Sequence, residues 1–96
     1  MIIYQVKIKI EEEVEKEWLH WMKTAHVPDV LATGVVLSAQ VLRSEDQERT
    51  YYFNYHFSSK QQYQIYHEKF GPKLKADTQQ LYGGRFQASR QILEMI

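Results

Sequence analysis

Apolar and polar residues alternate along the first stretch of the chain. Ile2, Tyr4, Val6, Ile8 and Ile10 fall on one parity, and Gln5, Lys7 and Lys9 fall on the other. This period of two is typical of a β-strand with one buried face. Similar alternation runs through 35–43, 50–57 and 85–95. The pattern therefore predicts four strands.

The stretch after the first strand has helical spacing. Three glutamates, 11–13, open it, and carboxylates are favoured in a first helical turn. The apolar residues that recur at helical spacing are Val14, Trp18, Trp21, Met22 and Ala25. Because a proline disfavours α backbone in the residue before it, Pro28 predicts that this helix ends near His26. A short second turn then runs toward Gly34, which we expect to end it.

A second helical stretch follows the strand at 50–57. Ser59 and Gln62 have the spacing of a capping box, which marks a helix start. Tyr63, Tyr66, Phe70, Leu74 and Leu81 give the stretch an apolar stripe. Gly71-Pro72 interrupts that stripe, so we expect two helical pieces with a break. Gly83-Gly84 is expected to form the turn before the last strand.

The order of elements is β-α-β-β-α-β, which is the ferredoxin-like arrangement. Both helical stretches would then cover one face of a four-stranded antiparallel sheet. A chain of 96 residues supports one such core. We therefore expect an α+β fold with a single ferredoxin-like domain over residues 1–96.

The alternation divides each strand between the two faces of the sheet. We assign Tyr4, Val6, Ile8, Leu37, Val41, Phe53, Tyr55, Phe86 and Ile92 to the helix-covered face. The opposite face would expose an apolar patch of Ile3, Val36, Leu42, Tyr52, Leu93 and Met95. Such a patch usually marks an interface, which predicts a symmetric homodimer with sheet packed on sheet. The alternative is an open sheet with scattered exposed apolar residues.

Charge and composition exclude several classes of protein. Lys plus Arg and Asp plus Glu both number 12, so the basic excess of a nucleic-acid-binding domain is missing. The absence of cysteine removes disulfides, thiolate catalysis and thiolate metal sites. No apolar run is long enough to cross a membrane, and the N-terminus lacks signal-peptide features. We expect a cytoplasmic protein without membrane or nucleic-acid partners.

One rival shares the predicted order of elements. An RNA-recognition domain places aromatic residues on its third strand, and Arg49, Tyr51 and Phe53 partly fit that pattern. The glycine expected at position 50 and the small residue expected at 52 are missing. Tyr51 and Phe53 also share parity with Tyr55 and Phe57, as on a core face.

Several short motifs together resemble a known family. They are Ile2-Ile3-Tyr4, Trp18-x-x-Trp21-Met22-x-x-x-His26-Val27-Pro28-Asp29-Val30, Thr33-Gly34 and Tyr82-Gly83-Gly84-Arg85-Phe86. The chain resembles, over nearly its whole length, small bacterial proteins of unknown function in the dimeric α+β barrel superfamily. The resemblance implies the ferredoxin-like fold, the dimer and a cavity between sheet and helices. Superfamily relatives include cofactor-independent monooxygenases, isomerases, haem-degrading enzymes and stress-induced proteins, and fold alone does not choose among them.

Residues of three types, a histidine, two tryptophans and an arginine, are candidates for a catalytic or binding role. His26 is either a pocket acid or base or a polar anchor for a ligand, or else a cap on the last carbonyls of its helix. Trp18 and Trp21 either wall a site for a flat ligand or belong to the core. Arg90 shares parity with Phe86, so it either binds an anion in the cavity or faces solvent after a register slip near Gly84.

Neither a metal nor a cofactor is expected. The four histidines lack ligand spacing, no haem ligand stands out, and no phosphate loop or nucleophile elbow occurs.

Three hypotheses for function follow. The first is binding of a small apolar or aromatic ligand, with a site formed by Tyr4, Trp21, His26, Tyr55 and Arg90. The second is a cofactor-independent monooxygenase or isomerase acting on an aromatic or enolisable substrate. There, His26 would move a proton and Arg90 would stabilise an enolate. The third is a structural or oligomerisation protein with a filled core.

Overall fold

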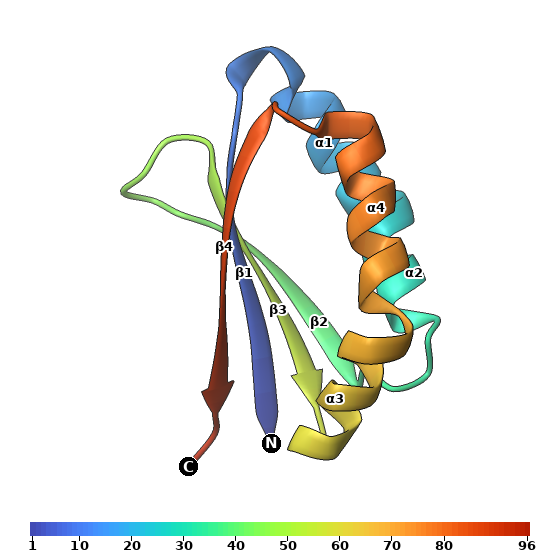
Figure 1. Cartoon of the computed structure of the whole chain (residues 1–96). Helices are drawn as coiled ribbons and strands as arrows, with labels where there is room; N and C mark the ends of the chain where they lie inside the picture. The colour runs from blue at the N-terminus through green and yellow to red at the C-terminus, as the bar shows by residue number, and fades with distance from the viewer.

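A computed structural model describes residues 1–96 as one sheet covered on one side by helices (Figure 1). The strands are β1 (Ile2–Ile10), β2 (Ser38–Arg43), β3 (Thr50–Phe57) and β4 (Phe86–Glu94). They are antiparallel in the order β2-β3-β1-β4. This is the ferredoxin-like α+β fold that the sequence predicts.

The helices form a layer over one face of the sheet (Figure 1). The first run consists of η1 (Glu12–Val14), α1 (Glu15–Trp21), η2 (Met22–His26) and α2 (Val27–Leu31). The second run consists of α3 (Lys60–Lys69) and α4 (Gly71–Tyr82), with the expected break between them. The Oγ of Ser59 accepts a hydrogen bond from the backbone N–H of Gln62, so Ser59 caps α3 as predicted.

The prediction that the first helix ends near His26 is wrong. Val27 has α-helical backbone angles, φ −61° and ψ −44°, and the chain continues directly into α2. The segment before Pro28, η2, is a π-helix. A π turn is a rare feature that widens the helix locally, and proline both lacks an N–H and crowds the carbonyl four residues earlier. His26 therefore lies inside a continuous helical run, and the interpretation of its ring as a helix C-cap is also wrong.

The second strand is shorter than predicted, which changes two side-chain assignments. Residues 35–37 precede β2, and strand pairing begins with Ser38 opposite His56. Val36 is buried in the core, whereas Leu37 is 58% exposed, the reverse of their predicted faces. The period of two holds only within a paired strand, so it fails where the chain approaches the sheet.

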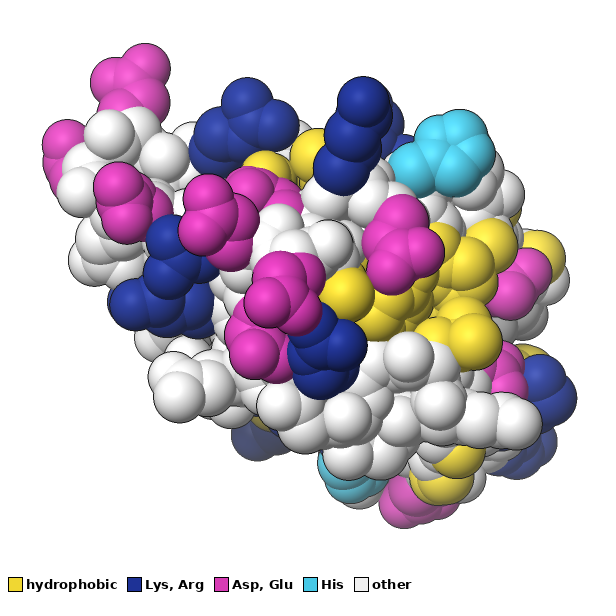
Figure 2. All heavy atoms as spheres, turned by 90° about the horizontal axis from the view of Figure 1, so that it is seen from above, with side chains coloured by type: hydrophobic (Ala, Val, Ile, Leu, Met, Phe, Trp, Pro, Cys, Tyr) yellow, Lys and Arg dark blue, Asp and Glu magenta, His cyan; other side chains and the backbone are white.

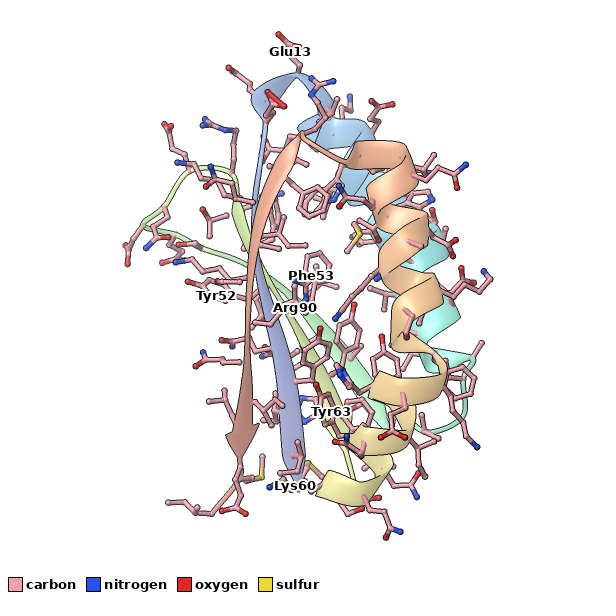
Figure 3. All side chains as sticks on the ribbon, in the orientation of Figure 1. Glu13, Tyr52, Phe53, Lys60, Tyr63 and Arg90 are labelled. Carbon is pink, nitrogen blue, oxygen red and sulfur yellow. The ribbon has the colours of Figure 1, made fainter.

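The core lies between the sheet and the helices. Nineteen hydrophobic residues form one buried cluster, and they include Tyr51, Phe53, Tyr55 and Phe57 of β3. Because these aromatic rings are covered, they do not offer the exposed stacking platform of an RNA-recognition domain. Figure 3 shows Phe53 on the helix side of the sheet and Tyr52 on the open side.

The surface carries charges of both signs. Figure 2, which views the molecule from above, shows acidic and basic side chains interspersed over this face. No helix of the structure has the length and apolar character needed to cross a membrane.

Candidate functional site

A cavity of about 480 Å³ lies between the sheet and the helical layer. β1, β3 and β4 form one wall, and η2, α3 and α4 form the other. Eleven of its 17 lining residues are hydrophobic. The sheet wall consists of Tyr4, Val6, Ile8, Phe53, Tyr55, Phe86, Ala88 and Arg90. The helical wall consists of Met22, His26, Tyr66, Pro72, Leu74, Lys75, Ala76, Thr78 and Gln79.

Tyrosine rings gather at one part of this cavity. The ring centroid of Tyr4 lies 6.2 Å from that of Tyr55, 5.4 Å from that of Tyr63 and 6.2 Å from that of Tyr66. Burial raises the pKa of Tyr4, Tyr55 and Tyr66 above that of a free phenol. The hydroxyls are therefore neutral at physiological pH, and each can donate one hydrogen bond to a guest.

Arg90 lies on the cavity side of β4. Val6 of β1 is its direct partner in the sheet, and the β1–β4 register is continuous from Ile2 to Ile10. The register slip considered from the sequence therefore does not occur, and Figure 3 places Arg90 on the helix side of the sheet. Its positive charge acts on the phenols of Tyr4, Tyr63 and Tyr66, where it opposes the upward shift of their pKa by burial.

No carboxylate neutralises Arg90. The ion pairs of the protein involve Arg49, Lys73 and Arg85 but not Arg90. The cavity lining contains Lys75 and no aspartate or glutamate. Although Arg90 itself is largely exposed to solvent, it lines an apolar cavity as an unpaired cation. Such a site favours an anionic guest, because a guanidinium forms charge-assisted hydrogen bonds with a carboxylate.

His26 enters the cavity from η2, on the wall opposite Arg90. Its Nδ1 lies 3.4 Å from Oγ1 of Thr78 on α4, and its ring centroid lies 5.4 Å from that of Trp21. Burial lowers the pKa of His26 below its ordinary value of 6.5, while the charges of Asp29 and Asp77 act in the opposite direction. The imidazole is therefore mainly neutral at pH 7.

The structure brings four of the five predicted site residues to one cavity. Tyr4, His26, Tyr55 and Arg90 all line it. Trp21 does not line it, but packs between the rings of His26 and Tyr82, with centroid distances of 5.4 and 5.7 Å. Trp21 therefore packs against the imidazole of His26 without lining the cavity itself.

The sequence reasoning missed the contribution of α4, which supplies Thr78, Lys75 and Gln79 to the lining. One signal was present for Thr78. It lies four residues after Leu74 and four before Tyr82, and all three are buried on the same helix face. A polar residue within an apolar stripe needs a hydrogen-bond partner, and Thr78 has two.

A second hollow lies on the surface beside α1 and the edge of the sheet. Its residues are mostly charged or polar, and Glu15, Lys16, Lys23 and Arg43 are among them. The hydroxyl of Tyr51 donates to Oε2 of Glu15 at 2.7 Å and accepts from Nε of Arg43 at 3.3 Å. The bond to Glu15 connects α1 to β3, and the bond to Arg43 connects β3 to β2. No group of three or more His, Asp or Glu side chains is placed to hold a metal ion anywhere in the chain.

Known structures share this architecture. An antibiotic biosynthesis monooxygenase superposes with a TM-score of 0.74 at 9% identity, over 100% of this chain and 99% of that one. The haem degrader MhuD of Mycobacterium tuberculosis, with two haems bound in its active site, gives 0.75 at 18% identity over 100% and 96%. A dimeric ferredoxin-like protein from an uncultured marine organism gives 0.71 at 13% identity over 100% and 95%. At these identities the similarity shows the fold alone, which is the ferredoxin-like α+β fold.

The sequence also matches a known protein family. Residues 1–96 match the model of a domain of unknown function, DUF4286, and the chain belongs to that family. This agrees with the family resemblance seen in the sequence motifs. No curated protein matches the sequence.

Proposed function

We propose that this protein binds a small aromatic anion in the cavity between the sheet and α4. The observation that carries the proposal is the unpaired Arg90 in a cavity whose lining is mostly hydrophobic and contains no acid. Ligand sites commonly combine an apolar lining with a few polar groups that fix orientation. Here the apolar walls select a flat ring and Arg90 selects its negative charge.

The cavity volume sets the size of the guest. A volume of about 480 Å³ lies within the range of roughly 300–1,000 Å³ that is usual for small-molecule sites. A bicyclic aromatic acid is a suitable probe, because its rings can lie among Tyr4, Phe53 and Tyr55 while its carboxylate reaches Arg90. The third hypothesis, a filled core, has less support because this space is open.

Calorimetric titration with 2-naphthoate tests the proposal. We expect saturable binding, and we expect Ala88→Trp to abolish it, because Ala88 lines the cavity and a larger side chain there would fill it. Gln80→Trp is the matched control, since Gln80 is exposed on α4 outside the lining. Near-ultraviolet circular dichroism checks that both variants are folded. Absence of binding by the wild type, or equal binding by the folded Ala88→Trp variant, would overturn the proposal.

The same proposal includes a homodimer that packs through the open face of the sheet. A ladder of side-chain hydrogen bonds crosses all four strands on this face, joining Gln91, Gln5, Asn54, Gln40 and His56. Because each amide in the ladder already makes at least one hydrogen bond within the chain, covering the face with a second copy leaves fewer polar groups to satisfy. Leu42, Leu93 and Met95 remain exposed around the ladder.

Light scattering after size-exclusion chromatography tests the dimer. We expect twice the chain mass of 11.5 kDa at low micromolar concentration. Leu93→Glu should give a single chain mass, because Leu93 and its β1 partner Ile3 lie on the open face. Gln80→Glu, on the outer face of α4, should leave the mass unchanged. A wild-type mass of 11.5 kDa would contradict the dimer.

A second candidate function is a cofactor-independent monooxygenase or isomerase. The observation that favours it is the neutral His26 opposite Arg90 across an aromatic cavity, in a fold shared with a monooxygenase. His26 would remove a proton from the substrate, Arg90 would stabilise the developing enolate, and Tyr55 would pack against the substrate ring. Under this function, His26→Ala abolishes turnover while 2-naphthoate still binds. Turnover that survives in His26→Ala would remove His26 from the mechanism.

A further inference from the structure

Two contacts of Thr78 bear on which nitrogen of His26 carries the proton. Oγ1 of Thr78 lies 3.3 Å from the carbonyl oxygen of Leu74 and 3.4 Å from Nδ1 of His26. A threonine hydroxyl has one proton to donate, and a carbonyl oxygen can only accept. Both contacts are hydrogen bonds only if Thr78 donates to Leu74 and His26 donates from Nδ1–H to Thr78.

The other ring nitrogen of His26 is then an acceptor without a partner. A neutral imidazole carries one proton, so Nε2 has a free lone pair when Nδ1 is protonated. No side chain or backbone group bonds to Nε2 of His26. Among the buried side-chain nitrogen and oxygen atoms, only Nε1 of Trp18 has no hydrogen-bond partner. Because Nε2 of His26 also has no partner, it is not one of the buried atoms and is reached by solvent. Trp21, packed on the imidazole, and the π turn of η2 keep the ring in the cavity wall.

The two walls of the cavity therefore offer complementary polar groups. The helical wall includes His26, whose Nε2 is free to accept, and the sheet wall includes the cation of Arg90. We propose that the ligand is a hydroxylated aromatic carboxylate, whose ring hydroxyl donates to His26 and whose carboxylate pairs with Arg90. Thr78 is the positioning residue that makes His26 an acceptor. This inference rests on the proposed binding of an aromatic anion and specifies its substituent.

The tautomer can be measured without any ligand. Nitrogen-15 spectra of the histidine rings at neutral pH distinguish a protonated Nδ1 from a protonated Nε2. We expect Nδ1–H for His26 in the wild type and in Thr78→Ser, which keeps a hydroxyl, and a shift toward Nε2–H in Thr78→Val. Thr24→Val is the matched control, because Thr24 makes the same kind of bond to the carbonyl of His20 but does not touch His26. Nε2–H in the folded wild type would overturn the proposal.

The substituent is tested by comparing three probes in calorimetric titrations. We expect 6-hydroxy-2-naphthoate to bind about 2- to 10-fold more tightly than 2-naphthoate, the range expected for one additional net hydrogen bond. The methyl ether, 6-methoxy-2-naphthoate, should show no such gain, because it has no proton to donate. Thr78→Val should remove the preference for the hydroxyl, and Thr78→Ser should retain it.

The outcomes separate this inference from the function on which it rests. If none of the three naphthoates binds, the proposed binding of an aromatic anion fails. If 2-naphthoate binds and the hydroxyl adds no affinity, the aromatic-anion site stands and the role assigned to His26 and Thr78 is wrong. An equal hydroxyl preference in the wild type and in folded Thr78→Val would also overturn that role.

Discussion

Val6 and Arg90 lie directly opposite each other on β1 and β4, so the arginine shares the cavity face of a buried valine. β4 is an edge strand, and the helical layer covers it only in part: Ile92, two residues beyond Arg90, is 50% exposed. Because the cover is partial, Arg90 lines the apolar cavity while its charge stays in contact with water. A guanidinium in that position needs no protein carboxylate to be tolerated.

Removing the charge of Arg90 should weaken the binding of aromatic anions selectively. We expect Arg90→Gln to lower the affinity for 2-naphthoate by about 10-fold, which is the scale of one hydrogen bond to a charged group at a partly hydrated site. The affinity for neutral 2-naphthalenemethanol should change little. Arg90→Lys should recover part of the loss. An equal loss for both probes in calorimetry would show that Arg90 acts through packing and not through charge.

The stability of the protein should depend on the protonation of His26. Burial lowers its pKa in the folded protein, so the unfolded chain, with a pKa of about 6.5, binds more protons between the two pKa values. The stabilisation is therefore complete above about pH 6.5 and is lost as the pH falls through the folded pKa. Asp29 and Asp77 face His26 and limit this shift, whereas Lys75 and Arg90 line the same cavity.

Urea unfolding between about pH 7.5 and pH 5 measures this dependence. The wild type should lose more stability over that range than His26→Gln, in which the titrating group is absent. The carboxylates and the other three histidines are common to both proteins, so the difference between the two curves isolates His26. Parallel curves would contradict the lowered pKa.

Trp18 should be the most sensitive aromatic position of the core. It is 0% exposed, and its ring lies 5.2 Å from Tyr51 and 5.8 Å from Phe53, measured between centroids. We expect Trp18→Ala to cost about 3–5 kcal/mol of unfolding free energy.

Trp18→Phe should cost less than half as much, because phenylalanine keeps the aromatic contacts and removes Nε1, a buried donor without a partner. Urea titrations followed by far-ultraviolet circular dichroism provide the comparison. A phenylalanine variant as unstable as the alanine variant would contradict this expectation.

The cap of α3 offers a local test of helix stability. Oγ of Ser59 accepts the backbone N–H of Gln62 at 3.2 Å, so Ser59→Ala should cost about 1 kcal/mol. Ser58→Ala is the matched control, since Ser58 is exposed and makes no side-chain hydrogen bond in the structure. In thermal unfolding, the midpoint temperature should fall for Ser59→Ala and stay unchanged for Ser58→Ala. Equal midpoints for the two variants would mean that the cap contributes nothing measurable.

Patterns within short segments determined most of the architecture. The alternation in 2–10 and 50–57 gave the bounds of β1 and β3 correctly, because a paired strand forces neighbouring side chains to opposite faces. Ser59 and Gly71-Pro72 likewise located the start of α3 and its break from α4. These signals are local, so they can be read without knowing what the segment packs against.

The tertiary structure decided the features that depend on distant contacts. The burial of Val36 and the register that turns Arg90 inward each depend on neighbours far along the chain. The pairing of His26 with Thr78 joins residues 52 positions apart, and no local pattern links them. Sequence periodicity identifies which face of an element is buried. Only the packing of the elements against each other decides where that burial leaves a cavity and which polar atoms meet inside it.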